Sequence, residues 1–387
     1  MAEPTERRRD PDDAERWRDP NDAERWRDPN DTERWRDPVR VGRRRGDGPR
    51  TPRAEGGEGA ARGLLWVAEH MLGGRDGERR PAVAGGSPSV IVGTADGGAT
   101  WAVRADPLTA PSTLTSISCP DDRHCMAVGY LAGAQLAGAA VTTSDGGRRW
   151  HTVNAPAGAS ELVAVSCRGG GRCLVLASDG SGLWSATTSD FGASWQRAGA
   201  LDPGFAGVGG LSCPDAGTCV TAGYVPTGPG HGNGAIQVTT DGGATWQAAS
   251  VPAGTGLLHA VACTDSRTCV AVGTSSTTTS GIAPDRGVVV TSGGVLTTFG
   301  AGRPPPALGD TFGVSCGAPA SCAAVGIAWT SAHPPVPTVG VATTLDGGSA
   351  WRTPESRYVP SGLAAVDCPT ASSCVAVGGD VTARLAL

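Results

Sequence analysis

The sequence contains no lysine, so all 32 basic residues are arginines, and aromatic side chains make up only 5% of it. No run of 18 apolar residues occurs, which excludes a recognisable membrane-spanning helix. The first residues are charged and no apolar stretch follows them, so no signal peptide is recognisable. What is abundant is glycine, with 59 residues. Many glycines beside a modest apolar content favour short strands joined by many turns.

Charge divides the chain into two parts. Residues 1–80 carry 19 arginines and 19 acidic residues, whereas the remainder carries 13 arginines and 18 acidic residues. The second part therefore has a net charge of −5. A mildly acidic domain has no broad attraction for nucleic acid or anionic membranes. We expect neither as a partner.

A nine-residue repeat fills the start of the chain, as in Glu15–Ala23. Each unit is mostly charged and holds a single tryptophan, too little apolar surface to offset the entropy of ordering the chain. We predict a disordered tail over residues 1–60. The alternative is a multivalent ligand in which Trp17, Trp26 and Trp35 dock into equivalent sites. Residues 61–87 are expected to be a linker with one short helix around 61–72.

Cysteines occur as six pairs, each with five residues between its members, and these pairs include all 12 cysteines. An even count and a constant gap predict six local disulfides, each pinning the corner of a hairpin, and disulfides imply an oxidising compartment. Zinc is the weaker alternative, because one pair offers only two ligands and the gap is longer than zinc motifs use. The export implied by disulfides conflicts with the missing signal peptide. The pairs are Cys119/Cys125, Cys167/Cys173, Cys213/Cys219, Cys263/Cys269, Cys316/Cys322 and Cys368/Cys374.

A second repeated segment, here termed the Asp turn, reads Thr-x-Asp-x-Gly-x-x-Trp. We expect its aspartate to accept backbone N–H groups two or three residues on, its glycine to supply a positive φ, and its tryptophan to seal the turn. A sixth copy at Thr291–Gly294 has lost the aspartate, and Phe299 is its nearest aromatic residue. The intact copies contain Asp96 and Trp101, Asp145 and Trp150, Asp190 and Trp195, Asp241 and Trp246, and Asp346 and Trp351.

Strand-like segments flank both features, so each repeat of roughly 50 residues has four strands, A to D. The A–B connection carries the cysteines and the C–D connection carries the Asp turn. We predict an all-β propeller over residues 88–387 with six four-stranded blades. The last blade would combine strands C and D from 89–103 with strands A and B from 363–378. A further strand at 381–387 would make seven blades the alternative.

The Asp turn resembles the Asp-box, or BNR repeat, of sialidase-like β-propellers. The fuller phrases SC-P-x4-C-x-AVG and T-x-DGG-x-x-W are similar to propellers related to photosystem II assembly and stability factors. The resemblance covers about residues 88–380. It implies the propeller fold without selecting an activity, because propellers of many functions share this turn.

A sialidase-like active site is not recognisable. Such a site needs an arginine triad, a Tyr/Glu nucleophile pair and an acid/base aspartate, whereas the domain offers two glutamates, Glu161 and Glu355. No histidine or carboxylate cluster indicates a metal, and no cofactor motif appears. We therefore expect no catalytic residues, no metal and no cofactor. The function we expect is a monomeric, non-enzymatic binding or assembly scaffold, extracellular or on the cell surface.

Two alternative functions stay open: a carbohydrate-binding protein or degenerate sialidase-like hydrolase, and a photosystem-assembly-factor-like protein. We expect a protein or glycan ligand on the face formed by the B–C loops and the D–A crossovers, because these loops vary between repeats. The A–B and C–D turns on the opposite face look merely repetitive. The candidate ligand residues are Tyr130, Trp184, Tyr224, His231, Trp329 and His333.

Overall fold

The computed structural model describes residues 64–67, 91–94, 102–103, 108, 111–275, 286–305, 308–329, 337–353, 363–378 and 381–386. The chain divides into two units, Met1–Glu58 and Gly59–Leu387, and all of these residues belong to the second. Their regular elements are strands, and none forms a helix long and apolar enough to cross a membrane. The predicted tail over 1–60 lies outside the described residues.

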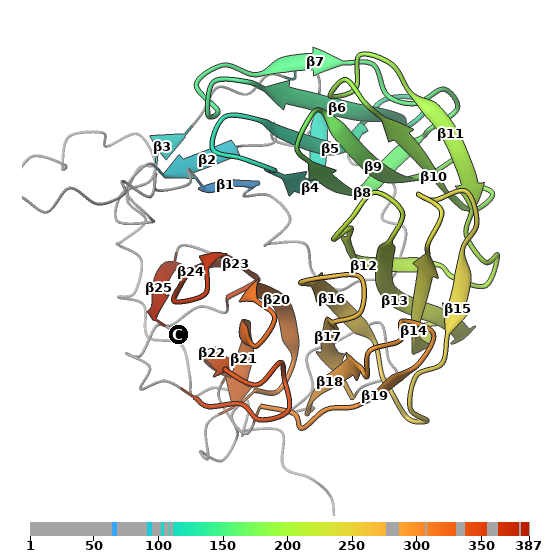
Figure 1. The fold of residues 1–387 in the computed structure, drawn as a ribbon. Helices are drawn as coiled ribbons and strands as arrows, with labels where there is room; N and C mark the ends of the chain where they lie inside the picture. The colour runs from blue at the N-terminus through green and yellow to red at the C-terminus, as the bar shows by residue number, and fades with distance from the viewer. Residues whose placement is uncertain are drawn as a thin grey trace, which may run out of the picture. The chain divides into compact units, whose positions relative to one another are not determined.

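Four antiparallel sheets of four strands form the central part of the chain, each a meander in sequence order (Figure 1). The first contains β4 (Ser112–Ser118), β5 (Cys125–Leu131), β6 (Ala137–Thr143) and β7 (His151–Val153). The second contains β8 (Glu161–Arg168), β9 (Arg172–Ser178), β10 (Leu183–Thr188) and β11 (Gln196–Ala200). The third contains β12 (Gly207–Ser212), β13 (Cys219–Gly228), β14 (His231–Thr239) and β15 (Gln247–Ala249). The fourth contains β16 (Leu258–Cys263), β17 (Cys269–Thr274), β18 (Gly287–Ser292) and β19 (Phe299–Ala301).

Three further sheets have three strands each. One contains β20 (Thr311–Ala318), β21 (Ser321–Trp329) and β22 (Pro337–Thr344), with a single bridge from Thr343 to Arg352 in the place of a fourth strand. The others contain β1 (Leu64–Val67), β2 (Ile91–Thr94) and β3 (Ala102–Val103), and β23 (Ala365–Thr370), β24 (Ser373–Gly378) and β25 (Val381–Ala386).

These terminal sheets correct two predictions. The last blade shared by both chain ends does not form among the described strands, because β1 pairs with β2 and β25 pairs with β24. Each terminal segment thus joins its own sheet, and the described residues form seven sheets, with the strand β25 in the place that the seven-blade alternative gave it. Residues 64–67, within the expected helix, are a strand instead. Their partner is Ile91–Thr94, whose open edge offers hydrogen bonds to an extended apolar segment.

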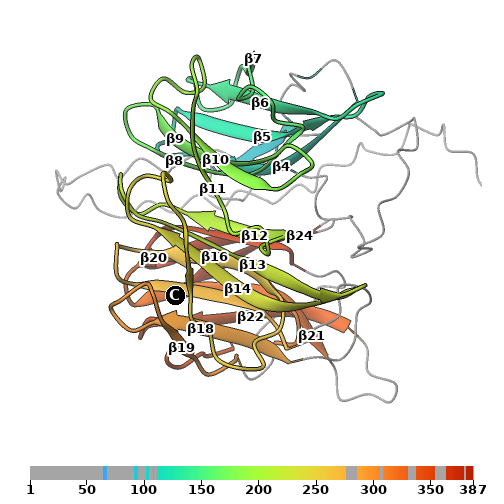
Figure 2. The same ribbon diagram turned by 90° about the vertical axis from the view of Figure 1, so that its right-hand side faces the viewer.

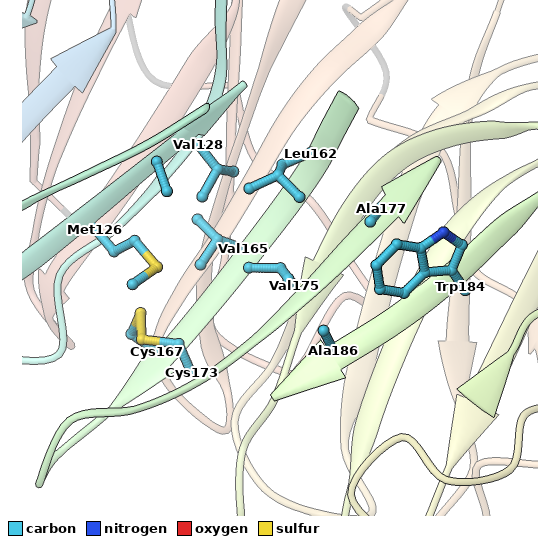
Figure 3. Close-up of a cluster of buried hydrophobic side chains, with 11 residues drawn as sticks. Met126, Val128, Leu162, Val165, Cys167, Cys173, Val175, Ala177, Trp184 and Ala186 are labelled. Carbon is cyan, nitrogen blue, oxygen red and sulfur yellow. A yellow bond between two sulfur atoms is a disulfide. The ribbon is translucent and has the colours of Figure 1, made fainter. Parts of the chain in front are cut away.

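The first strand of one sheet packs against the first and second strands of the preceding sheet. Strand β16 contacts β12 on one side and β20 on the other (Figures 1 and 2), and β8 contacts β4 in the same way. The interfaces are apolar. Figure 3 shows one of them, where Met126 and Val128 of β5 face Leu162 and Val165 of β8. Alternation along each strand supplies these side chains to the space between sheets.

All six predicted disulfides are present, and no described cysteine is free. Each closes an A–B hairpin, the connection between the first and second strands of a sheet, with Cα–Cα separations of 3.9–4.1 Å. Cys167, for example, lies directly opposite Cys173 across the ladder. Because the two cysteines face each other across the ladder, their side chains lie close enough to be bridged.

The second cysteine of each pair also belongs to the apolar core, besides closing its hairpin. Cys322 and Cys374, at the starts of β21 and β24, are 0% exposed and belong to the apolar core rather than to an accessible site. Cys322 packs in a buried cluster with Ala324, and Cys374 packs in another with Ala376. The reason is strand alternation, which points the first inward position of the second strand into the space between sheets. The equivalent residues Cys125, Cys219 and Cys269 are also buried.

The serine that precedes the first cysteine of most pairs links one sheet to the next, a role that the sequence pattern did not indicate. Its hydroxyl accepts the backbone N–H of the first cysteine in the following sheet. The bonds run from Cys167 to Ser118 (2.9 Å), Cys213 to Ser166 (3.1 Å), Cys263 to Ser212 (3.0 Å) and Cys368 to Ser315 (3.0 Å). The equivalent residue before Cys263 is Ala262, which has no hydroxyl to offer Cys316.

This gap allows a gain-of-stability prediction. Ala262→Ser should add the missing bond to the Cys316 N–H and raise the free energy of unfolding by about 0.5–1.5 kcal/mol. Ser166→Ala should lower it by a similar amount. Urea unfolding under non-reducing conditions measures both. A neutral or destabilising Ala262→Ser would show that these hydroxyls do not join the sheets.

Candidate functional site

The Asp turns are organised by their threonine rather than by their aspartate. In the turn of the third sheet, the Thr239 hydroxyl donates to Oδ1 of Asp241 (2.7 Å) and accepts the Gly243 N–H (2.9 Å). Thr239 is 1% exposed, whereas Asp241 is exposed. Oδ1 of Asp241 also accepts the Thr245 N–H (2.9 Å), four residues on rather than the expected two or three. The aspartate spans the turn and the threonine fills its interior.

The same network recurs at Asp145, Asp190 and Asp346. Asp96 and Trp101 lie outside the described residues. In the degenerate copy, Val270 pairs with Thr291, so Ser292 and not Thr291 occupies the threonine position opposite the second cysteine. Ser292 accepts the Cys269 N–H (2.8 Å) and donates to the Arg267 carbonyl (2.6 Å).

Two turn tryptophans reach beyond their own turn, which they were expected only to seal. Nε1 of Trp246 donates to the Ser185 hydroxyl (3.2 Å) and Nε1 of Trp195 donates to the Asn154 carbonyl (2.6 Å). Ser185 and Asn154 both belong to the preceding repeat, and the Ser185 hydroxyl also donates to the Gly243 carbonyl (2.8 Å). The turns therefore join neighbouring sheets as well as strands.

Hydrogen bonds to the turn carboxylates stabilise their charged form. The Ser194 and Thr188 hydroxyls lower the pKa of Asp190 to about 2, and the Thr245 and Thr239 groups do the same for Asp241. An acid with so low a pKa is ionised at neutral pH and is a poor general acid or base there. These aspartates accept the hydrogen bonds that hold the turn together.

A cleft of about 370 Å³ lies at the end of the second sheet that carries the disulfide and the Asp turn. This is the face that was expected to be merely repetitive. Its walls come from the A–B hairpin, the Asp turn and two loops of the third sheet. The lining residues are mainly polar and include no aspartate, glutamate or histidine: Arg168, Arg172, Cys173, Leu174, Thr187, Thr188, Ser189, Ser194, Trp195, Gln196, Ala216 and Gly242.

Arg168 is the partly buried cation of the cleft. Its Nη1 is shielded from solvent and has no hydrogen-bond partner. Burial lowers the pKa of Arg168 below its ordinary value, the nearby Arg172 adds to this effect, and Asp215 opposes it. The carboxylate of Asp215 already accepts the N–H groups of Gly217 (2.9 Å) and Thr218 (2.7 Å). The site thus holds positive charge without a direct anionic partner.

The predicted ligand residues differ in how far they are exposed to solvent. Trp184 is 1% exposed and packs among Val175, Ala177 and Ala186 (Figure 3), so it belongs to the core and not to a ligand surface. Its position on β10 faces the apolar interface between sheets, with the Arg197 guanidinium 4.0 Å from its ring.

Tyr224 is half-buried, and its ring covers Gly207 and Gly232, where an added Cβ would overlap it. Tyr130 and Trp329 are half-buried and His231 is exposed, each at the B–C end of its own sheet. No described contact joins them into one site. His333 lies outside the described residues.

The described residues contain no group of three or more His, Cys, Asp or Glu that could hold a metal. The arginines of the cleft could have been found from the sequence by comparing the six A–B hairpins. Only the second places arginine both after its first cysteine and before its second cysteine, at Arg168 and Arg172.

No family model matches the chain, and no curated protein matches its sequence. Solved structures share its fold. One is YCF48 bound to D1 peptide, at 16% identity and a TM-score of 0.53, covering 78% of this chain and 88% of that one. YCF48 from Cyanidioschyzon merolae gives 14% identity and a TM-score of 0.54, with 77% and 88% covered.

A GH74 xyloglucanase from Xanthomonas campestris gives 16% identity and a TM-score of 0.54, covering 76% of this chain and 50% of that one. These neighbours are β-propellers, so the likeness supports the propeller architecture expected from the repeats. At such identities the likeness concerns the fold alone. The resemblance to BNR repeats rests on the sequence motif and stays a prediction.

The position of Thr239 predicts that its hydroxyl matters more than its shape. Thr239→Val should leave the buried Gly243 N–H without an acceptor and lower the free energy of unfolding by about 1–3 kcal/mol. Thr239→Ser retains the hydroxyl and serves as the control. Chemical unfolding of both variants measures the difference. Equal stability of the valine and serine variants would contradict the account of the turn.

The lowered pKa values predict an acid-dependent loss of stability. Because the folded-state pKa of Asp190 and Asp241 is about 2, below the ordinary 3.8, their contribution is present above pH 4 and is lost as the pH falls toward 2. The melting temperature should fall over this window. Asp190→Asn combined with Asp241→Asn should flatten that dependence. An unchanged slope in the double variant would contradict the prediction.

Proposed function

We propose that this chain is a non-enzymatic scaffold that binds another protein through the cleft of the second sheet. The observation that carries the proposal is the lining of this cleft. It combines two guanidinium groups with hydroxyl and amide side chains, and none of its lining residues is a carboxylic acid or an imidazole. Such groups recognise a ligand by charge and hydrogen bonding, whereas general acid–base catalysis needs a titratable group within reach of the substrate.

The repeated frame supports this function. Disulfides, Asp turns and hydroxyl bonds between sheets hold the walls of the cleft in place before a ligand arrives. A rigid site loses little entropy on binding, so its few polar contacts are used efficiently. The YCF48 structure bound to a D1 peptide is a precedent for peptide binding by a protein of similar fold.

A carbohydrate ligand is the second candidate. Trp195 lines the cleft beside Gln196, and an aromatic face next to an amide suits a sugar ring. The fold likeness to a xyloglucanase is compatible with this alternative. Protein binding is favoured because Nε1 of Trp195 is engaged with Asn154 and the strongest polar groups in the cleft are cationic.

The cysteines support the proposed compartment. Six local disulfides persist in oxidising surroundings, which supports an extracellular or cell-surface location. We propose that the chain acts there as a monomer. The B–C ends with Tyr130, Tyr224, His231 and Trp329 remain a second predicted surface.

The test captures partners from the native extracellular fraction by crosslinking to the tagged full-length chain. Three baits are compared: the parent, a cleft variant with Arg168→Gln and Arg172→Gln, and a loop variant with Tyr130→Ala and His231→Ala. Loss of a protein partner from the cleft variant alone is the expected result, measured by quantitative mass spectrometry. Loss from the loop variant alone would move the site to the B–C ends, and equal retention by all three baits would refute both surfaces.

A further inference from the structure

The second A–B hairpin contains an unfavourable charge arrangement that the other hairpins avoid. Arg168 ends β8 and Arg172 begins β9, and the two are paired directly across the ladder, one position beyond the disulfide Cys167–Cys173. Like charges placed directly opposite each other on a sheet are destabilising. In four of the other hairpins both positions hold uncharged residues, and in the first hairpin they hold Pro120 and His124.

Nothing within the described chain neutralises this pair directly. No carboxylate lies within salt-bridge distance of either guanidinium among the described residues. Asp215, the acid that acts on Arg168 at longer range, is held by two backbone N–H groups of its own loop. A partly buried cation without a close anion costs free energy that a bound anion would recover.

The turn between the arginines keeps both side chains beside the cleft. Gly169, Gly170 and Gly171 connect them, and the last two have φ of 76° and 78°, which other residues seldom adopt. A Cβ on Gly171 would lie 2.9 Å from the Ser189 carbonyl oxygen, so the glycine allows the hairpin to pack tightly on the Asp turn. The hairpin is therefore shaped to carry the arginine pair against the polar wall of the cleft.

We infer that this cleft binds a carboxylate group, supplied by an acidic side chain of a polypeptide partner, between Arg168 and Arg172. The two guanidinium groups and the nearby Asp215 leave a net charge of about +1, which matches a monoanion better than a dianionic phosphate. Guanidinium forks suit the two oxygens of a carboxylate. Hydroxyls and the Gln196 amide line the remaining wall and can bind the flanking peptide groups.

This inference rests on the proposed function but is tested without the natural partner. The full-length chain is titrated with acetyl-glutamate amide, and binding is followed by NMR of the arginine Nε–H signals. We expect a saturable shift of the Arg168 signal that weakens about tenfold in Arg172→Gln, the loss of one charge-assisted hydrogen bond. Arg267→Gln, an exposed arginine of the fourth hairpin, is the matched control and should bind like the parent.

A second measurement separates binding from folding. Without ligand, Arg172→Gln should melt at a higher temperature than the parent, because it removes the opposed charge. At the same ligand concentration, the parent should gain more stability than the variant, because it binds the ligand more tightly. A lower melting temperature for the ligand-free variant would overturn the inference. So would the absence of any ligand-induced rise in the melting temperature of the parent. Tighter binding of glucuronate than of acetyl-glutamate amide would overturn the polypeptide source, and a shift with sulfate alone would overturn the carboxylate.

The two tests fail separately. Binding of acetyl-glutamate amide without capture of a protein partner would reject the proposed function while leaving the carboxylate site intact. Capture of a protein partner that depends on the cleft, without binding of acetyl-glutamate amide, would reject the carboxylate site and leave the proposed function intact.

Discussion

The disulfide across each A–B hairpin is the constraint from which the rest of each repeat is positioned. It joins cysteines that lie close on adjacent strands. The end of the first strand and the start of the second strand are therefore held next to each other. This places the serine before the first cysteine where it can accept an N–H from the next sheet. Because a short loop is closed, we expect each disulfide to contribute a few kcal/mol at most, and its larger effect is geometric.

The Asp turn completes the frame at the other connection of the same face. Its buried threonine accepts a glycine N–H that would otherwise lack a partner, and its exposed aspartate spans the turn. Hydrogen bonds such as the one from Trp246 to Ser185 then connect the turn to the preceding sheet. The two repeated features thus produce a rigid face. Individual repeats differ there at a few substituted positions, and Arg168 and Arg172 are two of them.

Much of this arrangement could be predicted from the sequence. The repeats, the four strands of the four central sheets and the cysteine pairing follow from the spacing, because local hairpins depend on nearby residues. The strand at Leu64–Val67 could not be predicted, since it pairs with a strand edge that spacing does not reveal. A strand over 381–387 is indicated by the sequence, and its pairing with β24 makes it the third strand of the last sheet. The burial of Trp184 could not be predicted either, because spacing does not reveal that its position on β10 faces the interface between two sheets. The cleft lies on the repetitive face, where Arg168 and Arg172 depart from the repeat and are the sequence signal that could indicate it.

The central claim is that six local disulfides shape this face of the protein. Its most direct test is disulfide mapping of the folded, unreduced chain by mass spectrometry of proteolytic peptides. The account predicts six bridges, each between the two cysteines of one hairpin, and no free thiol. A bridge between two hairpins, or reactive thiols in the folded protein, would contradict it.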